Sequence, residues 1–314
     1  MAVISASRKT DIPTYFSEWF LNCLEKGEFY IKNNPYDPRA VTHITFNKED
    51  IDCIVFWTKN PGPMLSKIEK LNEFEIPYYF QFTITGYDEE LEPNIPDRFT
   101  LIEQFRKLSK LTNGRVIWRY DPIIINDKYT FNRHLMEFSY IAEALEDFTD
   151  RCVISFVDLY SHLGNQFKDI NEIQSNRQDF INFCKELAYF ANVYNMQLFT
   201  CAEDLAFEDI GIKRGSCIDK ELIEKFCGYE IKVNKDKGQR TACLCAESID
   251  VGRYNTCKNG CLYCYAGKNP SDINKNFSKY NSNSTILCDE IKPTDIITEK
   301  KLKSLRRYSE LSIF

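Results

Sequence analysis

The stretch that decides the fold is RVIWRYDP, residues 115–122. Its first part is a run of β-branched and aromatic residues, which is typical of a strand buried on both faces, as parallel strands are. Its second part is polar and closes with Asp121-Pro122, a common turn pair. The stretch therefore predicts a buried parallel strand with charged side chains at its carboxyl end.

Five other runs share this character: VISAS (3–7), CIVFW (53–57), YYFQFTIT (78–85), VISFVDL (153–159) and QLFTC (197–201). Between them, apolar residues recur at helical spacing in residues 16–24, 101–108, 135–145 and 180–190. Six strands that alternate with helices predict an α/β fold. The segment VTHITF (41–46) interrupts this rhythm and predicts a small hairpin or an extra strand.

Periodicity does not distinguish an open doubly wound sheet from a barrel. Polar clusters, however, follow successive strands: SRKTD (7–11), WTKN (57–60), RYDP (119–122), DLYSH (158–162) and CAED (201–204). In a barrel, the carboxyl ends of all strands converge on one mouth. We therefore expect residues 1–213 to form a complete or partial (β/α) TIM-type barrel with its site at that mouth.

The polar side chains near these strand ends are the candidate site residues. We predict catalytic or substrate-binding roles for Arg8, Lys9, Asp11, Lys59, Arg119, Asp121, Asp158 and Glu203, and further ligand contacts from Gln81 and Thr83. The four cations of this set would favour an anionic small molecule, peptide or nucleotide. Structural roles compete with these: Asp11 before Ile12-Pro13 fits a helix N-cap, and Lys59 fits a loop that starts a helix.

Composition limits the function classes. The chain has 314 residues, of which 43% are apolar, enough for a sizeable core. Its net charge of -6 argues against broad attraction to nucleic acid without excluding a local basic groove. Neither a membrane-spanning run nor a signal peptide is evident, so we expect a cytoplasmic protein without a membrane partner.

Thirteen cysteines without an export signal fit a reducing compartment. Cys23, Cys53, Cys152 and Cys184 lie in apolar segments and fit buried hydrophobic roles. Seven other cysteines lie close together in residues 214–269, which are rich in glycine and charged residues: Cys217, Cys227, Cys243, Cys245, Cys257, Cys261 and Cys264. Cys201 lies before this region, at a strand end.

We expect residues 214–269 to form a Cys-rich extension whose order depends on metal rather than on a hydrophobic core. Residues 270–314 are expected to be a linker and tail, mobile as far as about residue 284 and then with a short strand and a basic helix.

The motif TCKNGCLYCYA (256–266) spaces three cysteines as C-x3-C-x2-C. A [4Fe–4S] cluster and a zinc ion both use such spacings. Zinc would need Cys243 or Cys245 as a fourth ligand, whereas a three-cysteine cluster leaves one iron open to a non-protein ligand. Cys243 and Cys245, with Cys217 and with Cys201 or Cys227, are candidates for a second cluster or zinc site, or are plain buried thiols.

CKNGCLYCYA resembles the C-x3-C-x-aromatic-C motif of radical S-adenosylmethionine (SAM) enzymes, and YCYA resembles most the spore photoproduct lyase branch. The resemblance implies a [4Fe–4S] cluster on Cys257, Cys261 and Cys264, SAM at its open iron, and Tyr263 near the adenine. It also implies a 5'-deoxyadenosyl radical, an electron donor such as flavodoxin or ferredoxin, and a partial barrel of six strand–helix units.

The motif's position differs from that in most such enzymes, where it follows the first strand. Here SRKTDIP stands there, and the Gly-rich acidic SAM motif is not evident in IVFWTKNPGP after the second strand. Through VFWTKNP, RYDP and CLCAESIDVGRYNTC, residues 1–268 resemble an uncharacterised bacterial family with the motif placed C-terminally. The thiamin pyrimidine synthase also carries its cluster cysteines C-terminally.

Two functions follow as hypotheses. The first is a radical SAM-type iron–sulfur enzyme with its substrate at the barrel mouth. The alternative is a non-catalytic binding or electron-transfer protein stabilised by zinc or an iron–sulfur centre. No catalytic triad, Walker loop or dinucleotide fingerprint is present, so hydrolase and kinase activities are not favoured.

Overall fold

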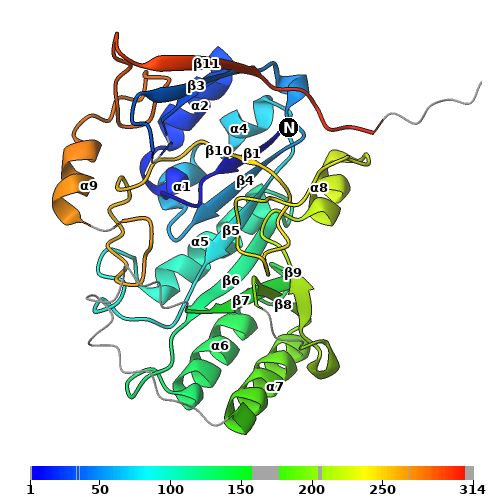
Figure 1. The fold of residues 1–314 in the computed structure, drawn as a ribbon. Coiled ribbons are helices and arrows are strands. Elements are labelled where there is room, and N and C mark those ends of the chain that lie inside the picture. The colour runs from blue at the N-terminus through cyan, green and yellow to red at the C-terminus, as the bar shows by residue number, and fades with distance from the viewer. Residues whose placement is uncertain are drawn as a thin grey trace, which may run out of the picture.

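The computed structural model describes residues 2–32, 34, 36–157, 177–203, 207–267 and 269–307. Its centre is an eight-stranded parallel sheet in the order β10-β1-β4-β5-β6-β7-β8-β9 (Figure 1). The strands are β1 (Val3–Ala6), β4 (Cys53–Thr58), β5 (Tyr78–Thr83), β6 (Val116–Ile123), β7 (Arg151–Phe156), β8 (Gln197–Cys201), β9 (Lys213–Gly215) and β10 (Ile249–Asp250).

The α/β prediction is confirmed, and all six predicted strands belong to this sheet as β1 and β4 to β8. β9 and β10 are short additions at the two edges, and within the described residues no pairing joins them. The predicted strand ends at Asp158 and Leu159 lie outside the described residues.

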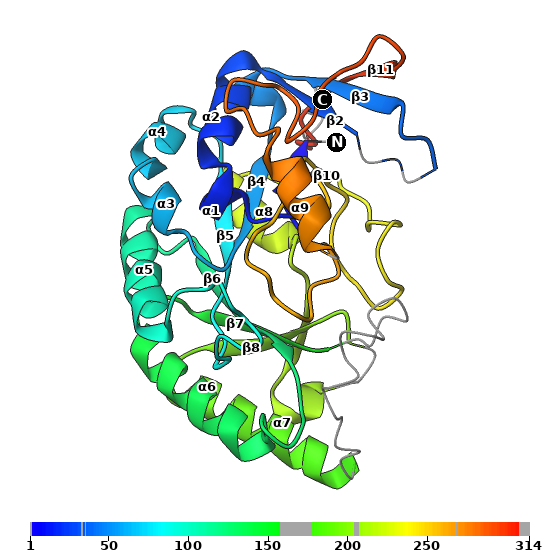
Figure 2. The same cartoon turned by 90° about the vertical axis from the view of Figure 1, so that its left-hand side faces the viewer.

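The helices between the strands follow one another along one face of the sheet (Figure 2). They are α1 (Ile12–Tyr15), α2 (Ser17–Lys26), α3 (Gly62–Leu65), α4 (Ile68–Glu73), α5 (Arg98–Leu111), α6 (Phe131–Leu145) and α7 (Arg177–Val193). Because successive strand residues point to opposite faces, Ile54 and Phe56 of β4 join the core under these helices. Their neighbours Cys53 and Val55 join a second core on the other face.

The Cys-rich extension covers that second face. Its helix α8 (Lys220–Cys227) and the loops around it contribute Ile218, Ile223 and Ile231 to one apolar cluster with Val55 and Tyr79 of the sheet. Ile218 and Ile223 are fully buried. The extension therefore shares a hydrophobic core with the sheet, where its scattered apolar residues find their partners. The expected dependence of its order on metal stays a prediction.

The C-terminal segment returns to the N-terminal part of the chain. A second sheet has the order β11-β3-β2, formed by β2 (Glu28–Ile31), β3 (Ala40–Thr45) and β11 (Ile296–Lys301). β2 and β3 are the hairpin expected around 41–46, and β11 is the expected C-terminal strand, parallel to β3.

Part of the predicted linker is instead the helix α9 (Pro270–Phe277), capped by the side chain of Asn269. Phe277 holds it in place through ring contacts with Phe16 and Tyr15 at centroid distances of 5.5 and 5.9 Å. The polar composition of residues 270–284 predicted a mobile linker, whereas the aromatic ring of Phe277 holds the helix against the N-terminal helices. Of the expected basic helix, the described residues 302–307 are not helical and the rest lies outside the described residues. No helix among the described residues is long and apolar enough to cross a membrane.

Candidate functional site

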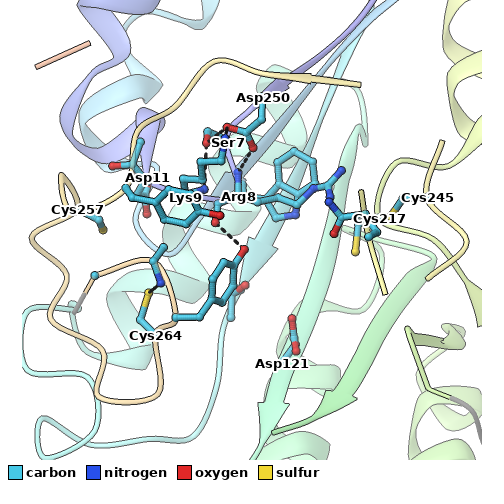
Figure 3. Close-up of a pocket in the computed structure, with 18 of the residues that line it drawn as sticks. Ser7, Arg8, Lys9, Asp11, Asp121, Cys217, Cys245, Asp250, Cys257 and Cys264 are labelled. Atoms are coloured by element: carbon cyan, nitrogen blue, oxygen red, sulfur yellow. Dashed lines mark hydrogen bonds and ion pairs between the residues drawn. The ribbon is translucent and has the colours of Figure 1, made fainter. Parts of the chain in front are cut away.

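A cavity of about 1090 Å³ lies at the carboxyl ends of the central strands, under the C-terminal extension (Figure 3). Most of the predicted site residues line it: Arg8, Lys9, Asp11, Lys59, Thr83, Arg119, Asp121, Tyr263, Cys217, Cys243, Cys245, Cys257, Cys261 and Cys264. Gln81 and Glu203 are not among its lining residues, and Asp158 lies outside the described residues. Parallel strands thus bring chain segments far apart in sequence to one cavity.

Arg119, in the middle of β6, is held by several partners. It is 5% exposed, its Nε lies 3.1 Å from Asp121 Oδ2, and its NH1 donates to Cys217 Sγ at 2.8 Å. Asp121 also accepts from Ser155 Oγ. Burial raises the pKa of Asp121, but the charge of Arg119 outweighs this, and the net pKa is below its usual value. The pair is thus a charged group fixed at the cavity wall.

Gln81 acts from behind the cavity. Its side chain is fully buried, and its Nε2 donates to the backbone oxygen of Cys217 at 3.0 Å. Glu203 accepts from the backbone nitrogen of Phe156 at 2.9 Å, which ties the ends of β7 and β8 together. Both side chains therefore position the residues around the cavity, and the predicted role of Gln81 in binding a ligand stays a prediction.

Asp11 is the N-cap of α1, which was the structural alternative for this residue, and its side chain accepts a hydrogen bond from Thr14 N at 3.0 Å. It also accepts from Thr58 Oγ1 at 2.9 Å and from Lys59 N at 2.8 Å. Burial raises its pKa despite these hydrogen bonds. The carboxylate therefore joins the start of α1 to the end of β4 while lining the cavity.

Lys59 and Tyr263 meet at Glu92, a buried carboxylate that sequence reasoning missed. Lys59 Nζ lies 2.7 Å from Glu92 Oε1, and the hydroxyls of Tyr263 and Thr85 donate to the same side chain. Lys59 also lies over the Tyr263 ring, 5.5 Å from its centroid. The aromatic side chain of the cysteine motif is thus fixed against the strand ends.

Asp250 is a second residue that sequence reasoning missed. Its β10 strand pairs with β1, which places its carboxylate within hydrogen-bond distance of Ser5 Oγ, Ser7 Oγ and Arg8 N. Lys9 Nζ lies 3.7 Å away. A two-residue strand has no periodicity to detect, so the surrounding SIDVG carried no signal. Asp250 fastens the extension to the first strand.

The motif cysteines lie on a loop that is anchored against residues 91–94. Leu262 N donates to Leu91 O at 3.0 Å, and Asn94 Nδ2 donates to Lys258 O at 2.9 Å. Gly260 has a φ of +72°, and a Cβ there would lie 3.1 Å from Asn94 and Pro93, so glycine is required for this approach.

The three thiols of this loop are partly exposed to the cavity. Burial raises the pKa of Cys257 well above its ordinary value; it also raises that of Cys261 to about 12, although nearby Lys59 opposes the shift. Both are therefore thiols at neutral pH in the absence of a ligand. Among the described residues, no three His, Cys, Asp or Glu side chains are already arranged as a metal site.

These features define a class: an α/β protein with an eight-stranded parallel sheet and a cysteine-lined cavity at the strand ends. Residues 3–266 match the family described as "Domain of unknown function (DUF1848)", and the chain belongs to that family. That description names no activity.

The search of curated proteins gave no match. Among solved structures, a proposed alpha-L-fucosidase from Bacteroides thetaiotaomicron is similar over 57% of this chain and 82% of its own, with 12% identity and a TM-score of 0.25. That likeness is too weak to carry an argument.

Proposed function

We propose that this protein is a radical SAM-type iron–sulfur enzyme whose [4Fe–4S] cluster is held by Cys257, Cys261 and Cys264. The observation that carries the proposal is that these thiols line the same cavity as the charged strand-end residues. A C-terminal motif therefore reaches the place where a barrel-type enzyme keeps its site.

The residues fit such a group in number and chemistry. Three thiols on one anchored loop leave a fourth position toward the cavity, and the Lys59 cation favours the thiolate form of Cys261. Tyr263, fixed by Glu92, offers an aromatic wall beside them. When bound, such a cluster supplies the electron for reductive SAM cleavage.

An anionic substrate is favoured by the balance of charge. The side chains of Arg8, Lys9, Lys59, Arg119, Arg240 and Lys300 line the cavity, against those of Asp11, Asp121, Asp236 and Asp250. The ion pairs Arg8–Asp236 and Lys9–Asp250, at 3.8 and 3.7 Å, reduce the cationic field that the sequence suggests. The remaining excess of cations favours a small carboxylate or phosphate group on a molecule, peptide or nucleotide.

The fold component of the proposal is a partial barrel. Its support is the all-parallel sheet with helices along one face and the cavity at the carboxyl ends of the strands. In a complete barrel, further strands would close the open side of the sheet. Here the extension would cover that open side instead.

The test is iron and sulfide quantitation on the anaerobically purified full-length chain, with electron paramagnetic resonance (EPR) of the reduced protein before and after addition of SAM. We expect about four irons at the motif and a SAM-dependent change of the signal. Cys261→Ser should lose this iron, whereas Cys184→Ser, which alters a buried thiol of α7 outside the cavity lining, should keep it.

Two outcomes would replace the proposal. A cluster whose spectrum ignores SAM would favour electron transfer, and absence of iron would favour a binding protein. Equal iron in the Cys261→Ser variant and the unsubstituted protein would place any cluster elsewhere.

A further inference from the structure

A second group of cysteines lies across the cavity from the motif loop. Cys201 ends β8, Cys217 follows β9, and Cys243 and Cys245 come from the extension. Figure 3 shows Cys217 and Cys245 on one side and Cys257 and Cys264 on the other, with Arg8 between them. Three separate chain segments therefore bring thiols to one place that the motif does not use.

The four thiols form a row in which each interacts with the next. The Sγ atoms of Cys201 and Cys217 lie 3.0 Å apart, and electrostatic interactions link Cys217 to Cys245 and Cys245 to Cys243. All four residues are buried, with exposed fractions between 2% and 8%. Cys227, the other candidate for this group, lies apart from it and donates to the backbone oxygens of Glu224 and Tyr229.

Two guanidinium groups face these thiols. Arg119 NH1 donates to Cys217 Sγ at 2.8 Å, and the charge of Arg8 interacts with Cys217 and Cys245. Arg8 Nε is buried and has no hydrogen-bond partner among the described residues. Four thiolates on one divalent ion carry a net charge of about -2, which neighbouring guanidinium groups help to stabilise. Each guanidinium also pairs with a carboxylate, Arg119 with Asp121 and Arg8 with Asp236. Plain core thiols need no such cations.

We propose that Cys201, Cys217, Cys243 and Cys245 bind one zinc ion in a closed, fully protein-ligated site. Zinc takes four thiolates as a tetrahedron with Zn–S distances of about 2.3 Å, so its sulfur ligands lie about 3.8 Å apart. The Sγ atoms of Cys201 and Cys217, which lie 3.0 Å apart, need only a small spread to reach that spacing. Cys243 and Cys245 would have to turn toward the same centre, because the four thiols are not yet arranged around one point. The thiolates of a four-iron cluster bind separate irons and lie further apart, which this crowded row does not suit.

Zinc binding would place the four sulfurs around one centre. Four thiols and one Zn²⁺ give a tetrathiolate zinc centre and four released protons, so the S–H···S hydrogen bond of Cys201 and Cys217 is exchanged for Zn–S bonds without any change of oxidation state. The ion would join the end of β8 to the extension and hold the extension over the second face of the sheet. This inference does not depend on the motif cluster.

The test is metal quantitation on the full-length protein together with zinc X-ray absorption spectroscopy. We expect one zinc per chain and four sulfur ligands at about 2.3 Å. Cys201→Ser and Cys243→Ser should each lose the zinc, and Cys184→Ser should retain it. Because Cys261→Ser should remove iron without removing zinc, failure of this site and failure of the motif site are distinguishable.

Three results would overturn the proposal: absence of zinc, iron and sulfide lost with the Cys201 variant, or a Cys201–Cys217 disulfide in protein prepared under reducing conditions. If the serine variants do not fold, the absorption spectrum of the unsubstituted protein still decides, because fewer than four sulfur ligands contradicts the site.

Discussion

Arg119 touches both halves of the cavity, since it pairs with Asp121 at the strand ends and with Cys217 of the thiol row. Such a side chain cannot be replaced without leaving a partner unsatisfied. Glu92 plays a comparable part for Lys59 and Tyr263. At the scale of single residues, the site is a set of linked ion pairs rather than a collection of free charges.

Replacing Arg119 by methionine should lower the free energy of unfolding by about 3 kcal/mol, because the Asp121 carboxylate would lose its counter-charge in a largely buried position. Urea unfolding measures the change. The matched control is Arg307→Met, because Arg307 and Glu230 form an exposed pair with an N–O distance of 3.5 Å. Its cost should be below about 1 kcal/mol. Similar losses in both variants would contradict the importance of the buried pair.

At the scale of elements, His134 joins α6 to β6. Its Nδ1 is hydrogen-bonded to the hydroxyl of Tyr120 at 2.8 Å, and its Nε2 to the backbone oxygen of Ile124 at 2.9 Å. Burial lowers the pKa of this histidine to about 4. The folded state therefore keeps His134 neutral where the unfolded chain already binds a proton.

This difference predicts a loss of stability on acidification. Because the folded pKa lies below the unfolded one, the contribution is complete above about pH 6.5 and falls as the pH drops toward 4. At 1.36 kcal/mol per pKa unit, the loss is at most roughly 3 kcal/mol. Unfolding free energies measured from pH 7 to 4 should show a slope that His134→Gln reduces. An identical slope in the variant would show that other groups cause it.

The contact of α9 with the N-terminal helices supports a second prediction at this scale. Phe277→Ala should reduce stability by about 1–2 kcal/mol, less than a fully buried phenylalanine, because the ring is only partly buried. Hydrogen exchange should become faster in residues 270–280. Phe99→Ala, at a ring that is 57% exposed, is the control and should change neither quantity appreciably. Unchanged exchange in the Phe277 variant would show that α9 is held by other contacts.

At the scale of the whole molecule, Asp250 fastens the extension to the first strand. Asp250→Asn keeps the size of the side chain but removes the charge that faces Lys9 and the backbone of Arg8. We expect faster limited proteolysis within residues 236–267 and little change in α5 or α6. Asp272→Asn, at an exposed position of α9, is the control. Equal proteolysis of both variants would mean that the extension is held without this carboxylate.

Local pattern accounts for the scaffold. The strands around Phe56, Phe80 and Trp118 are apolar enough to be recognised as buried on both faces, and the helices repeat apolar residues at helical spacing. The polar residues that follow the strands could be predicted as site residues, because the carboxyl ends of parallel strands lie at one edge of the sheet. These features depend only on residues that are close together in the sequence, so they can be recognised from one sequence.

The sequence by itself therefore determined the six central strands, the four longest helices between them (α2, α5, α6 and α7) and the charged strand-end residues of the cavity. The tertiary structure decided what depends on distant partners: that Asp250 meets Ser5, 245 positions away, that Cys201 meets Cys217, and that the extension packs against the sheet. Such contacts are fixed by the packing of whole elements, and they leave no period in the sequence around either partner.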